Sequence, residues 1–115
     1  MQTVLIVDID EDVLIRLQHT LEAEGYSTDT AWSGREALCL AKKSKFDMLL
    51  VGDYLGDLDS GTLVDKLKEL QPSAALLLMR ARKKPNASSQ HLGISLVCKF
   101  EQDEVMKKVR DSLAA

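Results

Sequence analysis

The sequence lacks long apolar runs and is poor in cysteine, proline and aromatic residues. Its two cysteines form no CxxC pair and no cluster with histidine, so neither a disulfide framework nor a zinc site is indicated. Its apolar runs fall well short of the ~20 residues that span a bilayer. The amino terminus has neither the basic region nor the cleavage site of a secretory signal. We therefore expect a cytoplasmic protein with no membrane partner.

Both cysteines, Cys39 and Cys98, lie inside apolar, periodic segments. Cysteine without a disulfide or metal partner behaves as a small buried hydrophobic residue. We predict that both are buried free thiols in a reducing compartment.

The excess of basic residues that is typical of nucleic-acid-binding proteins is also missing, because the net charge is −3. We therefore expect no nucleic acid as a partner. With 45% hydrophobic and 29% charged residues, the composition is that of an ordinary globular protein. The length of 115 residues fits one domain over residues 1–115, of a size that also occurs as one part of longer proteins.

What the sequence does contain is a series of short apolar segments that end abruptly in polar residues. Such segments are typical of strands buried on both faces of a parallel sheet. We predict five strands, at Thr3–Val7, Tyr26–Ala31, Met48–Gly52, Ala74–Met79 and Ser95–Cys98. The second of these alternates and is rich in threonine, which indicates a strand near an edge of the sheet.

Helical patterns separate these strands. Ser33 and Glu36 have the spacing of a capping box, and Asp59 or Ser60 can cap the helix after the third strand. Gly25 is placed to end the first helix. The predicted buried stripes consist of Leu14, Leu17 and Leu21, then Leu63, Leu67 and Leu70, and in the last helix (101–113) Val105 and Val109.

Only a short or irregular helix fits between Arg80 and Gly93. Strands that alternate with helices predict an α/β fold, with a five-stranded parallel sheet, right-handed crossovers and helices on both faces. In such a sheet, chemistry collects at the carboxyl ends of the strands. The first strand ends in Asp8 and Asp10 and the third in Asp53, so we expect one acidic pocket at that edge.

Over essentially its whole length the chain resembles the receiver domains of two-component response regulators. Three features carry the resemblance. The first strand ends at Asp8 with further acids beyond it, and the third strand ends at Asp53, with Ser60-Gly61 opening the next helix. The fifth strand ends at Lys99, just before the last helix. The resemblance implies a single-domain flavodoxin-like (CheY-like) doubly wound fold.

The resemblance also implies a role for each residue of the site. Asp53 would accept a phosphoryl group from a phosphohistidine of a sensor histidine kinase or phosphotransfer protein. Asp8, Asp53 and the backbone carbonyl of Leu55 would bind Mg²⁺, with Asp10 as an additional candidate. Lys99 would pair with the phosphoryl oxygens. Such a domain is a signalling module and not an enzyme, and it often works with an effector domain or as a homodimer.

The sequence departs from the family pattern at two positions that matter for this chemistry. Receivers usually have two adjacent acids after the first strand, but here Ile9 occupies the second position. The hydroxyl that senses phosphorylation at the end of the fourth strand is replaced by Arg80. We therefore predict an atypical receiver with weak Mg²⁺ binding or none. It either accepts a phosphoryl group on Asp53 or acts as a pseudo-receiver through protein–protein interaction.

A second interpretation comes from a different class of protein. Asp8-Ile9-Asp10 resembles the DxD motif of haloacid-dehalogenase-type Mg²⁺-dependent phosphatases, and Gly52–Asp57 resembles their GDxxxD motif. In that case Asp8 would be the nucleophile and Asp10 the general acid/base. The segment between the two motifs is short for such an enzyme, which also needs a threonine or serine strand end and a lysine helix there.

Overall fold

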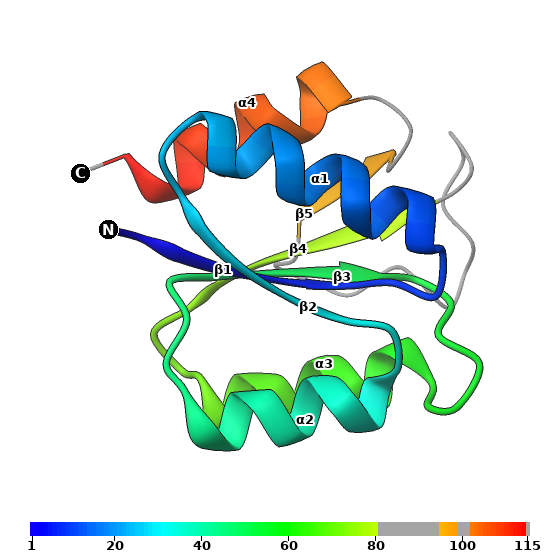
Figure 1. The fold of residues 1–115 in the computed structure, drawn as a ribbon. Helices are drawn as coiled ribbons and strands as arrows, with labels where there is room; N and C mark the ends of the chain where they lie inside the picture. The colour runs from blue at the N-terminus through cyan, green and yellow to red at the C-terminus, as the bar shows by residue number, and fades with distance from the viewer. Residues whose placement is uncertain (81–94, 99–101, 115) are drawn as a thin grey trace.

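The computed structural model describes residues 1–80, 95–98 and 102–114. It has five parallel strands in the order β2-β1-β3-β4-β5 (Figure 1). The elements are β1 (Thr3–Val7), α1 (Glu11–Ala23), β2 (Ser27–Ala31), α2 (Gly34–Lys43), β3 (Met48–Gly52), α3 (Ser60–Leu70), β4 (Ala75–Arg80), β5 (Ser95–Cys98) and α4 (Gln102–Leu113). The predicted α/β fold is confirmed, and β2 is an edge strand as expected. The predicted short helix between β4 and β5 falls on residues 81–94, outside the described residues.

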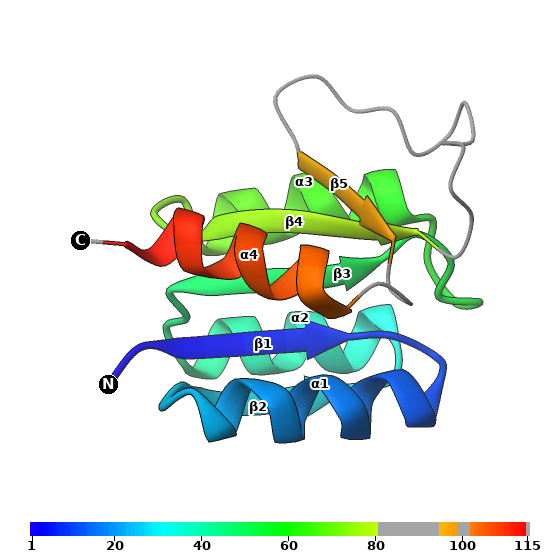
Figure 2. The ribbon, with the colours of Figure 1, turned by 90° about the horizontal axis from the view of Figure 1, so that it is seen from above.

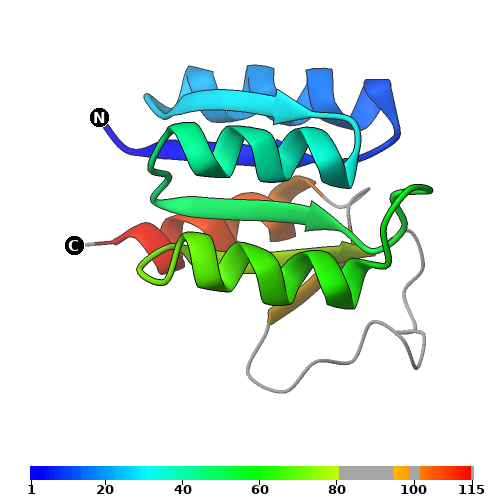
Figure 3. The ribbon, with the colours of Figure 1, turned by 90° about the horizontal axis from the view of Figure 1, so that it is seen from below.

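The sheet is covered on both faces, by α1 and α4 on one side (Figure 2) and by α2 and α3 on the other (Figure 3). Side chains alternate between the two faces along each strand. Val4 and Ile6 pack with α1 and α4, whereas Leu5 and Val7 pack with α2 and α3. Because both faces are apolar, polar groups of the inner strands can meet water only beyond the strand ends.

The predicted helix boundaries are largely confirmed. Gly25 has a φ of 95° directly after the last turn of α1, a left-handed conformation that glycine adopts without strain. Ser33 Oγ accepts a hydrogen bond from Glu36 N, and an Asp59 side-chain oxygen accepts one from Thr62 N. These side chains occupy N–H groups that would otherwise have no partner in the first turns of α2 and α3.

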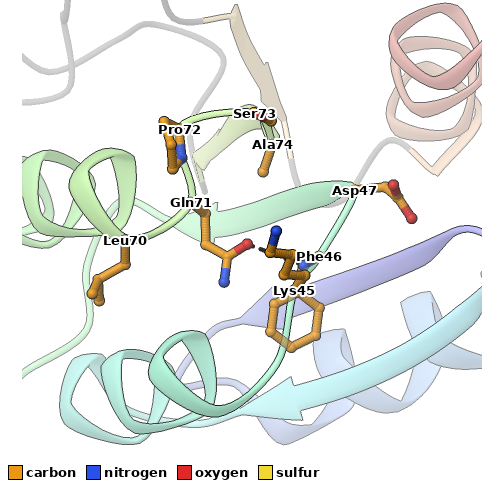
Figure 4. Close-up of a pocket in the computed structure, with 8 residues that line it drawn as sticks. All are labelled: Lys45, Phe46, Asp47, Leu70, Gln71, Pro72, Ser73 and Ala74. Carbon is orange, nitrogen blue, oxygen red and sulfur yellow. Dashed lines mark hydrogen bonds between the residues drawn. The ribbon is translucent and has the colours of Figure 1, made fainter.

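One predicted core residue is wrong. Leu70 was expected to complete the buried stripe of α3, but its side chain is 38% exposed. Instead, the next residue, Gln71, is buried (Figure 4). Its Nε2 donates to the carbonyls of Ala41 and Ser44, and its Oε1 accepts from Phe46 N. Gln71 thereby fastens the end of α3 to the end of α2, which leaves Leu70 at the rim of a hollow of about 290 Å³.

The loop between β3 and α3, at the carboxyl ends of the strands, is hydrogen-bonded to the start of α2. The two carboxylate oxygens of Asp57 accept hydrogen bonds from Gly34 N (2.9 Å) and Arg35 N (3.0 Å). Leu58 packs so closely on Gly34 that a Cβ there would lie 2.8 Å from Leu58 Cδ1. The hydrogen bonds from Gly34 and Arg35 lower the pKa of Asp57 below its ordinary value of 3.8.

The expectation of two buried thiols is wrong for Cys39, which is exposed and free. Its segment is periodic, but Ala37 and Ala41 form the buried face of α2, and position 39 lies on the outer side. Cys98 is in β5, of which only the backbone is described. Of the helices described, none is long and apolar enough to cross a bilayer.

Replacing Gln71 with alanine should lower the free energy of unfolding by about 2–4 kcal/mol, because three backbone groups lose a hydrogen-bond partner, two of them in buried hydrogen bonds and one in a part-buried one. Urea denaturation measures the change. Glu69→Ala, an exposed substitution on the same helix, is the control and should change stability by less than about 0.5 kcal/mol. Equal stability of both variants would contradict the role given to Gln71.

Replacing Asp57 with asparagine should make stability less dependent on pH. The folded pKa of Asp57 is lowered, so its contribution is present above about pH 4 and is lost as the pH falls through the folded pKa. Asparagine has one acceptor oxygen for two N–H donors and does not ionise. Urea midpoints measured from neutral pH down to about pH 3 should therefore fall less steeply with decreasing pH than in the wild type. Asp65→Asn, at an exposed site on α3, should keep the wild-type slope, and a wild-type slope in Asp57→Asn would refute the argument.

Candidate functional site

The candidate site lies at the carboxyl ends of the strands, which we call the carboxyl edge of the sheet. β3 lies between β1 and β4, so the residues that follow these three strands are neighbours (Figure 1). Asp8 follows β1, Asp53 follows β3 and Arg80 is the last residue of β4. The structure therefore brings three of the predicted site residues to one edge. Lys99, the predicted cation, lies outside the described residues.

Asp8 is the most enclosed carboxylate of the site, with an exposed fraction of 0%. Its Oδ1 accepts a hydrogen bond from Asp10 N at 2.9 Å. Its Oδ2 lies against the backbone of Gly52, where an added Cβ would come within 2.7 Å of that oxygen. A buried carboxylate is costly unless polar groups or cations surround it. The close approach needs glycine at 52, which places Asp8 next to the residue that precedes Asp53.

Asp53 continues the sheet by one residue. Its N–H donates to Met79 O at 2.8 Å, beyond the last Cα pair of β3 and β4, Gly52 with Met79. The side chain is half-buried, so it is more accessible than that of Asp8. It borders a hollow of about 270 Å³ that the following loop lines, with two further carboxylates on its wall, Asp57 and Asp59.

Arg80 ends β4 at the predicted switch position, where its Cα pairs with Cys98 of β5. The side chain is half-buried, and its Nε is removed from water without a hydrogen-bond partner among the described residues. A buried donor without a partner costs about 1–3 kcal/mol. This is an uncommon arrangement, and it lies directly beside the end of β3.

The two residues between Asp8 and α1 serve different purposes. Ile9, at the position where receivers usually have an acid, presents a side chain that is 46% exposed. Asp10 is the N-cap of α1, because its Oδ1 accepts from Asp12 N at 3.0 Å. One oxygen of this candidate metal ligand is therefore already bound to its own helix. The sequence did carry a signal for the cap, an aspartate directly before an acidic first turn.

The residues present fit a hard divalent cation of the kind that receivers bind. The predicted donors are the carboxylate oxygens of Asp8 and Asp53 and the backbone carbonyl of Leu55, whose buried side chain anchors the loop to the core. Within residues 1–80, 95–98 and 102–114, no group of three or more His, Cys, Asp or Glu side chains could hold a metal ion.

Three large exposed apolar side chains follow the ends of three adjacent strands. Trp32 follows β2 and is 64% exposed, Ile9 follows β1, and Tyr54 follows β3 and is 69% exposed. Aromatic and aliphatic side chains in such positions often mark a contact surface. Nothing in the local sequence pattern distinguishes an exposed tryptophan from a buried one at a helix entry.

The phosphatase interpretation finds no support in the geometry. It requires Asp8 as an accessible nucleophile, but that side chain is fully buried and one oxygen accepts from Asp10 N. It also requires Asp10 as a mobile acid/base, but Asp10 caps α1. Of Asp8 and Asp53, Asp53 has the more accessible carboxylate.

Comparison with known proteins gives one consistent result. Residues 4–110 match the response regulator receiver domain family. A response regulator receiver protein of Anaeromyxobacter sp. is 35% identical over 81 residues, which cover 70% of this chain and 34% of that protein. The transcriptional regulatory protein PcoR of Escherichia coli is 29% identical over 98% of this chain and 52% of its own length. The chain thus spans about half or less of these two relatives.

Solved structures agree on the fold. The response regulator TrrA of Thermotoga maritima, in complex with Mg²⁺–BeF, superposes with a TM-score of 0.85 and 25% identity over 98% of this chain and 100% of TrrA. TrrA has also been solved in complex with the histidine kinase ThkA. The family match extends over nearly the whole sequence and agrees with the doubly wound sheet and its acidic carboxyl edge. The chain belongs to the receiver domain family of two-component response regulators.

Proposed function

We propose that Asp53 is the phosphoacceptor of this receiver domain. The supporting observation is its position, at the carboxyl end of the strand that lies between β1 and β4, with a side chain that is accessible where Asp8 is not. One carboxylate oxygen of Asp53 forms the new bond to phosphorus while the bond from phosphorus to the donor breaks. The donor is the phosphohistidine of a sensor histidine kinase or phosphotransfer protein, whose imidazole leaves.

Asp8, Asp53 and the Leu55 carbonyl are the ligands that we propose for Mg²⁺. The bound ion would neutralise charge on the phosphoryl oxygens. Asp8 is held in place by Asp10 N and by the backbone of Gly52, so its carboxylate needs little reorganisation to act as a ligand. Ile9 removes the third carboxylate that the family usually supplies, and we expect weak binding for that reason.

A second candidate function is that of a pseudo-receiver, which acts by binding a partner whatever the state of Asp53. The observation that favours it is the loss of an acid at Ile9 together with the exposed row of Ile9, Trp32 and Tyr54. Since the chain spans only part of its curated relatives, a partner can be an effector domain, a second copy or another protein. We place this activity in the cytoplasm, where two-component signals are transmitted.

Acetyl phosphate with Mg²⁺ should add the mass of one phosphoryl group to the wild-type chain. Asp53→Asn should abolish this shift, because the reacting oxygen and its charge are lost. Asp8→Ala should slow the reaction without abolishing it, because Asp8 only holds the metal. Intact-mass spectrometry provides the measurement.

The same experiment separates the three functions. If Asp8→Ala lost the mass shift and Asp53→Asn kept it, the result would support the phosphatase interpretation, in which Asp8 is the nucleophile. A folded wild-type chain that never gains the mass would refute the phosphoacceptor proposal and favour the pseudo-receiver.

Replacing Ile9 with aspartate should strengthen Mg²⁺ binding about tenfold, because an additional carboxylate raises the charge and number of oxygen ligands. A Mg²⁺ titration followed by the fluorescence of Trp32, which follows the neighbouring strand end, measures the affinity. The matched control is Ile15→Asp, which adds the same charge at another exposed isoleucine on α1 and should leave the affinity unchanged. If both variants respond alike, position 9 is not part of the metal site.

A further inference from the structure

Arg80 and Asp53 are neighbours across the ends of two strands. The last Cα pair of the β3–β4 register is Gly52 with Met79, and Asp53 N still donates to Met79 O at 2.8 Å. The parallel ladder therefore continues to Asp53, whose counterpart on β4 is the next residue, Arg80. Their placement is set by the sheet and does not depend on the conformation of a loop.

The alternation of side chains puts both residues on the same face of the sheet. Val51 and Leu78 pack in the cluster under α2 and α3, whereas Met79 belongs to the cluster under α1 and α4, and Gly52 faces Asp8. One step further along each strand, the side chain returns to the α2 and α3 side. Asp53 and Arg80 are thus adjacent in register and on the same face.

The guanidinium of Arg80 is only partly satisfied in this position. Its Nε is buried and has no hydrogen-bond partner among the described residues. Buried polar groups in native proteins are nearly always paired with protein, water or ligand. The Nε–H and one terminal N–H of an arginine form a planar fork that binds two oxygens of a carboxylate or phosphate at once.

We propose that Arg80 is an anion-binding residue for the phosphoryl group carried by Asp53, with its Nε–H donating to a phosphoryl oxygen. This inference rests on the proposed role of Asp53. The hydroxyl that other receivers place at the end of the fourth strand donates one neutral hydrogen bond. Arg80 supplies a fixed positive charge as well, at the edge of the sheet where Ile9 has removed a metal ligand.

The consequence is a phosphoryl site that depends less on metal. Charge on the bound group is neutralised in part by the protein itself, so occupancy should persist at Mg²⁺ concentrations too low to fill the site formed by Asp8 and Asp53. The arginine then contacts the phosphoryl group directly, so its own environment changes when the site fills. That change is directly observable at its Nε–H.

The experiment is a titration of the chain, labelled with ¹⁵N-arginine, with beryllium fluoride in the presence of Mg²⁺. The Nε–H resonance of Arg80, assigned by its loss in Arg80→Lys, should shift as the site fills. Arg80→Met should weaken beryllium fluoride binding by about tenfold or more, because a charge-assisted hydrogen bond is removed. Arg80→Lys, which keeps the charge but not the fork, should lie between the two.

Arg16→Met is the matched control, because it removes one exposed arginine charge from α1 and should leave the affinity unchanged. Thermal unfolding of each variant verifies that it is folded. If beryllium fluoride binds the wild type and Arg80→Met equally well and the Nε–H does not shift, the inference is overturned while the phosphoacceptor role of Asp53 stands.

If the wild type binds no beryllium fluoride and gains no phosphoryl group, the proposed function fails and inorganic phosphate decides the inference. In Asp53→Asn the carboxylate that repels a free anion is gone. A saturable shift of the Arg80 Nε–H with phosphate in that variant, lost in the double variant with Arg80→Met, would support the anion site. No shift would overturn it.

Discussion

β3 is hydrogen-bonded to β1 on one side and to β4 on the other, and it is buried along its whole length. A strand in that position has no place for a polar side chain before its last residue, because both faces are covered by helices. The carboxylate of Asp53 is therefore presented at the first position where charge is tolerated. The same constraint acts on β1 and β4, and it collects Asp8, Asp53 and Arg80 at one edge.

This constraint also explains which features of the fold could be predicted from the sequence. Apolar runs ending in aspartate are local patterns, so strands such as Thr3–Val7 and Met48–Gly52 and their acidic carboxyl ends could be predicted from the sequence. The alternation of strands with helices predicted the parallel sheet. Tertiary contacts could not. Gln71 is buried because it fits between the ends of α2 and α3, and no local pattern distinguishes it from an exposed glutamine. Cys39 is exposed because two small alanines take the buried face of its helix.

The site residues divide in the same way. The position of Asp53 follows from the strand that carries it. The state of Arg80 follows from its neighbours, since whether its Nε is satisfied depends on side chains from several elements. Asp10 is an intermediate case, because its role as N-cap has a local signal, whereas its role as a candidate metal ligand came from the family resemblance. A family pattern assigns roles to residues by their position in the sequence, whereas the hydrogen bonds in the structure determine which of their side-chain atoms can still bind a metal or an anion.

The hydrogen bonds from Gly34 and Arg35 to Asp57 restrict the length of the loop between β3 and α3. Asp53 is fixed at one end by the sheet, and Asp57 is fixed at the other by the first turn of α2. The three residues between them, 54–56, must span a set distance, and Gly56 does so with a φ of 81°. One residue more or fewer would displace either the acceptor or the helix cap. Most surface loops tolerate insertions, but this loop is fixed at both ends. Among related chains, its length should therefore vary less than the identity of its residues.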